Sequence, residues 1–326
     1  MTKFRLLHAI WLVPWLMLAS ACNEDFTPFN EIEGLRVLAV RAEPPTVGVG
    51  ESVDLTPLVY LEAGDLQDVS YRWTLCPYLD PNDARACANR SDVFSGVEEG
   101  SDASLGEDLG EGATATFTFT EEMAELYASV CSGSAQAVAG YDLALVNCEG
   151  GFPMNVLLTV RHGEDEVVTF KEVRLALDDL TERNTNPALL DEVFVAEQDG
   201  EDDKPPRGDV ALVNDGELAL DQRYRLFLVV DEAASETFLD EKGNTDEPAE
   251  EREENLYVTW FVSVGETHYG RTSLVPSQDD TLPLDENTWE LPSPLDEEAT
   301  EADLYFVLRD ERGGVDWIER HVRLSR

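Results

Sequence analysis

The chain is poor in positive charge and in histidine. Its 326 residues include 23 Lys and Arg against 68 Asp and Glu, a formal net charge of −45, and only 4 histidines. Binding to nucleic-acid phosphates needs clustered Lys and Arg, so this balance excludes nucleic acid as a partner and disfavours adsorption to anionic lipid. The acidic excess predicts a solvated, soluble surface, with cation binding as the alternative.

Recognisable catalytic motifs are missing as well. The sequence contains no His-Glu-x-x-His pair, no Gly-x-Ser-x-Gly elbow, no Ser-x-x-Lys pair and no phosphate-holding glycine loop. Carboxylates are so abundant that no two of them stand out as the acid and base of a hydrolase. We therefore predict no enzyme, no catalytic residue and no cofactor, and a hydrolase that uses scattered carboxylates is the less favoured alternative.

Long apolar runs are absent beyond the N-terminus. Two basic residues precede an apolar stretch over residues 6–19, which is shorter than the roughly 20 residues that a helix needs to cross a bilayer. The small residues Ala19, Ser20 and Ala21 end this stretch, and Cys22 follows directly. A charged start, a short apolar stretch and small residues at its end predict an export signal over residues 1–21.

The residues around the predicted cleavage site resemble the bacterial lipobox, with Ala19 in the place where leucine is commonest. The resemblance implies that Cys22 receives a diacylglycerol thioether and becomes the first mature residue. Acyl chains contribute roughly 0.8 kcal/mol per buried methylene, so several together anchor a protein firmly to a membrane. Residues 22–32 would then form a tether in the cell envelope, and the periplasmic and outer-surface faces both stay open. An ordinary signal peptide with a chance cysteine is the alternative.

Four cysteines remain once Cys22 is assigned to lipid. An even number in an oxidising compartment predicts two disulfide bonds. Three pairings are possible, and we favour the local pairs because each closes a short loop, worth about 3 kcal/mol in the chain-entropy model. A zinc site is less favoured, because no Cys-x-x-Cys pair or nearby histidine is present. The four predicted disulfide cysteines are Cys76, Cys87, Cys131 and Cys148.

The two halves of the chain repeat one pattern. Residues 155–161 and 167–175 flank a charged turn with a glycine, and residues 303–309 and 315–324 do the same near the C-terminus. Each pair predicts a β-hairpin. In both halves a strand that ends in tryptophan precedes the hairpin.

The tryptophan-bearing strands span residues 69–73 and 256–260, and residues 113–120 alternate threonine with apolar side chains. Many short alternating strands separated by turns predict an all-β sandwich. Trp73 and Trp260 are expected to fill the space between two sheets.

The segments 33–45 and 183–190 carry a resemblance that extends over most of the mature chain. In this order of strands the chain resembles bacterial immunoglobulin-like modules, and especially the immunoglobulin-like lipoprotein families of high-GC Gram-negative bacteria. The resemblance implies two tandem immunoglobulin-like β-sandwich domains. Antibody topology is in doubt, because Cys76 follows Trp73 by three residues and no cysteine of the predicted domain precedes that tryptophan to form the usual bridge between the sheets.

We predict the first domain over residues 33–180 and the second over residues 181–326. The first is longer between its tryptophan and its hairpin, so it should carry a disulfide-bearing insertion at about 77–150. This insertion includes a predicted helix at 121–130, where Met123, Leu126, Tyr127 and Val130 recur at helical spacing. The acidic segment 232–254 has little to bury and is expected to be a disordered loop.

These features favour an extracytoplasmic binding or structural module, acting in adhesion or as a scaffold, with a protein or glycan partner. Calcium-dependent adhesion is an alternative, because residues 80–83 and 199–203 offer the oxygen ligands that Ca²⁺ prefers. Neither segment has the twelve-residue EF-hand spacing, so we predict no metal site. His162 and His321 are expected to be solvated.

Overall fold

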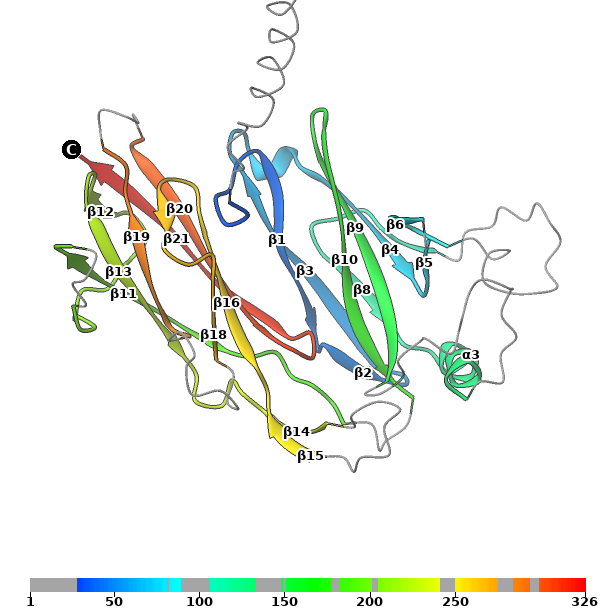
Figure 1. Ribbon diagram of the computed structural model, residues 1–326. Helices are drawn as coiled ribbons and strands as arrows, with labels where there is room; N and C mark the ends of the chain where they lie inside the picture. Colours follow the sequence, from blue (N-terminus) through cyan, green and yellow to red (C-terminus); the bar gives the residue numbers. More distant parts are fainter. Residues whose placement is uncertain are drawn as a thin grey trace, which may run out of the picture.

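The computed structural model describes residues 28–80, 82–88, 106–132, 148, 151–177, 182–200, 205–240, 250–274, 284–293 and 299–326. The predicted export signal and Cys22 lie outside these ranges. Nearly all of the described secondary structure is β-strand, arranged as two sandwiches side by side (Figure 1). In the described part of the chain, no helix has the length and apolar character needed to cross a bilayer.

Eight strands build the first sandwich. They are β1 (Leu35–Glu43), β2 (Thr46–Gly48), β3 (Ser52–Leu61), β4 (Ser70–Cys76), β7 (Glu107–Gly110), β8 (Ala115–Thr118), β9 (Phe152–His162) and β10 (Asp165–Ala176). One sheet has the order β1-β3-β8 and the other the order β2-β10-β9-β4-β7. The remaining elements of this half are η1 (Leu66–Asp68), β5 (Leu79–Asp80), β6 (Asp83–Cys87) and α3 (Glu121–Cys131).

The second sandwich repeats the plan. Its strands are β11 (Leu189–Gln198), β12 (Gly216–Ala219), β13 (Arg223–Val230), β16 (Leu256–Val262), β17 (Glu266–Thr267), β18 (Arg271–Leu274), β19 (Glu286–Glu290), β20 (Glu301–Asp310) and β21 (Val315–Ser325). They form sheets of order β11-β13-β19-β17 and β12-β21-β20-β16-β18. A separate two-stranded sheet pairs β14 (Thr237–Asp240) with β15 (Glu250–Glu253).

The strand order identifies both sandwiches as immunoglobulin-like. In each, the final hairpin lies between the tryptophan-bearing strand and a short strand that runs parallel to the last one, β2 along β10 and β12 along β21. The opposite sheet contains the first long strand, as in immunoglobulin folds. The predicted fold class is confirmed: two tandem immunoglobulin-like sandwiches, the first with a disulfide-bearing insertion.

Each core is built around the tryptophan that the sequence analysis placed there. Trp73 and Trp260 are fully buried. The Trp73 indole N–H donates to the Gly112 carbonyl at 2.9 Å, and that of Trp260 donates to the Thr272 hydroxyl at 2.8 Å. Because the polar end of each ring has a partner, burial of the large apolar ring carries no unpaired donor.

The insertion differs in extent from the prediction. Strands β7 and β8 fall inside the predicted range 77–150, yet they pair with β4 and β3 as members of the two sheets. The reason is the alternation in β8, whose Ala115 and Phe117 point into the core. The extra residues therefore lie in two segments, one on each side of this pair of strands.

The predicted helix is present as α3, capped by Thr120, whose hydroxyl accepts from the Met123 amide at 3.3 Å. Tyr127 and Val130 are buried, and Tyr127 stacks on Phe152 with ring centroids 4.1 Å apart. Disulfide bonds join Cys76 to Cys87 and Cys131 to Cys148, the local pairs.

The predicted disorder over residues 232–254 is wrong for the two ends of this segment, where β14 and β15 pair. Residues 241–249 lie outside the described ranges. The two short strands are stabilised by Arg252, which lies over the Phe238 ring at 4.5 Å and forms an ion pair with Asp240 at 2.6 Å. Because Arg252 of β15 contacts both an aromatic ring and a carboxylate of β14, it holds the two short strands together.

Candidate functional site between the two sandwiches

An apolar interface joins the two sandwiches. The outer faces of β1 and β3 pack against the outer faces of β16, β20 and β21, and Val307 within this interface is 0% exposed. Tyr60 and Tyr305 meet edge to face, with ring centroids 6.0 Å apart. The buried members of this cluster, distinct from both cores, are Ile32, Leu38, Ala39, Leu58, Tyr60, Phe261, Val307 and Val315.

The linker between the sandwiches is held by two asparagines. Asn186 donates to the Ala42 carbonyl at 2.8 Å, and its side-chain oxygen accepts from the Val315 amide at 2.8 Å. The Asn184 side chain donates to the Asp310 carboxylate at 3.0 Å, and the Asn184 backbone amide donates to the Thr46 hydroxyl at 3.3 Å. Each asparagine therefore binds both sandwiches, a role that the sequence analysis did not assign to the segment 183–190.

Replacing Asn184 with alanine should lower the free energy of unfolding by about 1–3 kcal/mol, because the buried Asp310 carboxylate loses a hydrogen-bond donor. The matched control is Asn255→Ala, which removes an exposed bond to Glu311 and should cost less than about 0.5 kcal/mol. Urea unfolding of both variants measures the difference. Equal effects would mean that the linker asparagine does not contribute in this way.

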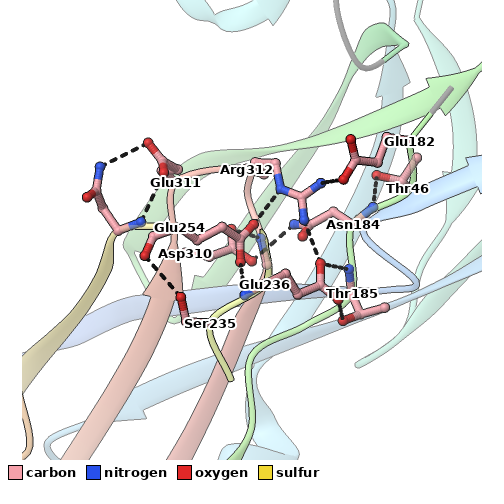
Figure 2. Close-up of polar contacts among 12 residues, drawn as sticks. Thr46, Glu182, Asn184, Thr185, Ser235, Glu236, Glu254, Asp310, Glu311 and Arg312 are labelled. Carbon is pink, nitrogen blue, oxygen red and sulfur yellow. Dashed lines mark hydrogen bonds and ion pairs between the residues drawn. The ribbon is translucent and has the colours of Figure 1, made fainter. Parts of the chain in front are cut away.

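Arg312, in the turn between β20 and β21, gathers three carboxylates (Figure 2). It forms ion pairs with Glu236 at 2.5 Å and with Glu254, while Glu182 of the linker lies at 4.0 Å. The Glu254 side chain is 1% exposed, and its other oxygen accepts from the Glu236 amide at 3.2 Å. Burial raises the pKa of Glu254, and the bond from Arg312 opposes this shift.

Glu236 extends this cluster to the linker. It accepts hydrogen bonds from the hydroxyl of Thr185 and, at 3.4 Å, from the Thr185 amide. Glu311, which precedes Arg312 in the turn, accepts from the Asn255 backbone amide at 2.9 Å and forms an ion pair with Arg252. The turn is thus tied both to the linker and to the segment that carries β15.

Beside the turn lies a cavity of about 260 Å³ between the two sandwiches. Strands β1 and β10 of the first sandwich and β16 and β20 of the second line it. Lys171 is 8% exposed there and donates to the Gly313 carbonyl. Arg309 donates to the Leu38 carbonyl at 2.6 Å and to the Thr259 hydroxyl at 3.0 Å.

The Leu38 carbonyl is available because of a bulge in β1. The register passes from Val37 opposite Val59 to Ala39 opposite Leu58, so Leu38 is the extra residue. A bulge leaves its extra residue outside the ladder, and Arg309 of the other sandwich binds it.

The charged groups of this cavity are partly withdrawn from water. Burial lowers the pKa of Lys171 to about 8, with Asp310 opposing the shift and Arg309 adding to it. Burial also lowers the pKa of Arg309 and raises that of Asp310. Convergent ionisable groups with shifted pKa values in a cavity are typical of binding sites, which makes this cavity a candidate site within the described part of the chain.

A sequence signal for the site exists, although the sequence analysis did not use it. Lys171 lies on the same face of β10 as the buried Val173 and Leu175. Asp310 likewise ends a buried series on β20 that includes Phe306 and Leu308. A charged residue at an inward position of an alternating strand indicates either a buried pair or a site.

The residues singled out from the sequence lie elsewhere. Asp80 accepts from the Asn82 amide at 2.7 Å, and Asp83 pairs with Arg85 at 3.2 Å. Within the described ranges, no three acidic, histidine or cysteine side chains gather closely enough to hold a metal ion. His321 forms a hydrogen bond with the Asp303 carboxylate at 2.7 Å, and this bond raises the pKa of His321. Of the segment 199–203, residues 201–203 lie outside the described ranges.

No family model matches the sequence, and no curated protein matches it. Among solved structures, the chain aligns over 90% of its length with all of the N-terminal Ig1-2 module of the Drosophila receptor protein tyrosine phosphatase DLAR, at 9% identity and a TM-score of 0.22. It aligns over 88% with all of murine CEACAM1b, at 8% identity and 0.20. It aligns over 87% with 58% of the Yersinia pseudotuberculosis adhesin InvE, at 12% identity and 0.19. The fold assignment rests on the strand order.

Proposed function

We propose that this chain is a lipid-anchored extracytoplasmic lipoprotein whose two sandwiches act together as one binding or structural module, in adhesion or as a scaffold. The observation that carries the proposal is the buried interface between them, with Val307 fully buried and the linker asparagines bonded to both sides. Domains joined by small polar contacts move relative to each other, whereas a buried apolar interface fixes them. A fixed pair presents a binding surface of constant shape to a protein or glycan partner.

The end of the predicted tether contacts the second sandwich. Residues 22–32 are predicted to form a tether, and at its end the Ile32 amide donates to the Val262 carbonyl at 3.1 Å. The Val262 amide donates to the Asn30 carbonyl at 3.1 Å, and the Asn30 side chain donates to the Thr267 hydroxyl at 2.7 Å. The chain thus touches the second sandwich just before it enters β1 of the first. A lipid on Cys22 would hold both sandwiches near the membrane.

We further infer that the chain is a member of the bacterial immunoglobulin-like lipoprotein families. The lipobox-like segment Ala19-Ser20-Ala21-Cys22 and the pair of sandwiches support this inference.

Cys22→Ser tests the anchor directly. The native protein should sediment with membranes and dissolve in detergent, whereas the variant should be found in the soluble fraction, because only a cysteine accepts the thioether lipid. The control is the Cys131→Ser, Cys148→Ser double variant, which removes a disulfide and should still sediment. If native and Cys22→Ser proteins fractionate alike, the lipid anchor is wrong.

Protease treatment of intact cells separates the two roles. Peptides from residues 187–326 released from intact cells would place the module on the outer surface, which favours adhesion. Release only after the outer membrane is opened would place it in the periplasm, which favours a scaffold.

A further inference from the structure

We propose that the cavity between the two sandwiches binds a small organic monocarboxylate, held by Lys171 and Arg309. The cavity is large enough, at about 260 Å³, for a molecule of several heavy atoms. Its two basic groups come from different sandwiches, Lys171 from β10 and Arg309 from β20. A bound carboxylate would therefore contact both halves of the module. The proposal does not depend on the membrane anchor.

The net charge of the groups that line the cavity favours a ligand with a single negative charge. Lys171 and Arg309 contribute +2 and Asp310 contributes −1, so the three lining groups sum to +1. The Asp310 oxygens already accept from the Asn184 side chain at 3.0 Å and from the Gly314 amide at 2.7 Å. Its carboxylate is thus held by the linker and the turn. A dianion such as phosphate would leave an uncompensated charge in a half-buried site, which is unfavourable.

Lys171 has donors to offer. An ammonium group can donate three hydrogen bonds, and within the described part of the chain Lys171 donates to the Gly313 carbonyl alone. The charged groups that face it are Arg309 and Asp310 from β20 and Glu172 from its own strand. The β1 wall supplies only residues 37–40, which are apolar. A carboxylate would add a charge-assisted hydrogen bond to a poorly solvated cation.

The walls also suit an organic acid rather than a bare ion. The residues Val37, Val40, Phe170 and Tyr257 line the cavity. These apolar surfaces can pack against a short alkyl chain while the carboxylate meets the two cations, the usual division of labour in small-molecule sites.

Calorimetric titration of the detergent-solubilised full-length protein with sodium propionate tests the proposal. We expect saturable binding at pH 7, and binding at least about tenfold weaker for propionamide, which has the same shape without the charge. Affinity should fall about tenfold or more between pH 7 and pH 9.5, because burial lowers the pKa of Lys171 to about 8 and the neutral amine no longer attracts a carboxylate. Binding of propionamide as tight as propionate would overturn the proposal, as would the absence of saturable heat.

Two variants assign the site. Lys171→Met keeps the aliphatic length, removes the charge and should weaken propionate binding about tenfold or more. Arg161→Met, which removes an exposed pair with Glu166 on the same hairpin, should bind as the native protein does. Ala39→Leu keeps both cations and fills the cavity from the β1 wall, so it should also lose binding. Melting curves verify that each variant folds, and unchanged binding in a folded Lys171→Met or Ala39→Leu protein would refute the site.

Discussion

Replacing Arg312 with methionine should lower the free energy of unfolding by about 3–5 kcal/mol, because it leaves a buried carboxylate without its cation. Glu254 is the carboxylate concerned, since its side chain is 1% exposed and Arg312 is its ion-pair partner. Methionine keeps most of the volume of the arginine stem, so the loss reports charge rather than packing. Urea unfolding at pH 7 measures it.

The matched control is Arg161→Met, whose ion pair with Glu166 is exposed and should contribute less than about 1 kcal/mol. A double variant, Arg312→Met with Glu254→Gln, should recover most of the loss because no unpaired buried charge remains. Similar losses for Arg312→Met and Arg161→Met would show that the cluster at the turn does not stabilise the protein.

The pH dependence gives a second signature of the same cluster. Burial raises the folded-state pKa of Glu254 above 4.5, so its ionised form costs stability at neutral pH and this cost disappears as the group takes up a proton. Without Arg312 the folded-state pKa rises further. The deficit of Arg312→Met should therefore shrink as the pH falls from 7 toward 4.5, and a deficit that is constant with pH would contradict this assignment.

Val307→Asp should separate the two sandwiches. Val307 is fully buried in the interface, and an isolated carboxylate there would cost about 3 kcal/mol or more, so opening the interface to water becomes the cheaper outcome. Each 1.4 kcal/mol by which the substitution destabilises the closed interface raises the population of open molecules about tenfold. We expect a larger radius of gyration by small-angle scattering and roughly hundredfold faster tryptic cleavage after Arg183 in the linker.

The control for this experiment is the same substitution at an exposed valine. Val210 is 64% exposed, so Val210→Asp should leave both the radius and the cleavage rate unchanged. If Val307→Asp behaves like Val210→Asp, the sandwiches are not held by this interface, and the proposed fixed module loses its main support.

Much of each sandwich can be predicted from the sequence, because strands and hairpins follow from local patterns. Alternation placed both final hairpins, and the buried Trp73 and Trp260 lie where the repeat predicted them. Helical spacing also located α3. Cys22 and the export signal stay predictions. Local composition also gave a wrong prediction, because the acidic residues 232–254 were interpreted as disordered although β14 and β15 pair within them. These strands are stabilised by Arg252, which pairs with Glu311 from a turn distant in the sequence.

The site between the sandwiches depends on tertiary structure. Val307 and Arg309 lie on the face of β20 opposite to the core, and from the sequence alone such a face is read as solvent-exposed. The one local hint is that the outer faces of these strands carry some apolar side chains, Phe261 on β16 and Tyr305 and Val307 on β20, as strands covered on both sides do. The sequence by itself determined the two sandwiches, since their strands are set by residues near one another in the chain. Only the packing of one sandwich on the other decided that Lys171 shares a cavity with Arg309 and Asp310, because β10 of the first sandwich and β20 of the second are brought together by no local pattern.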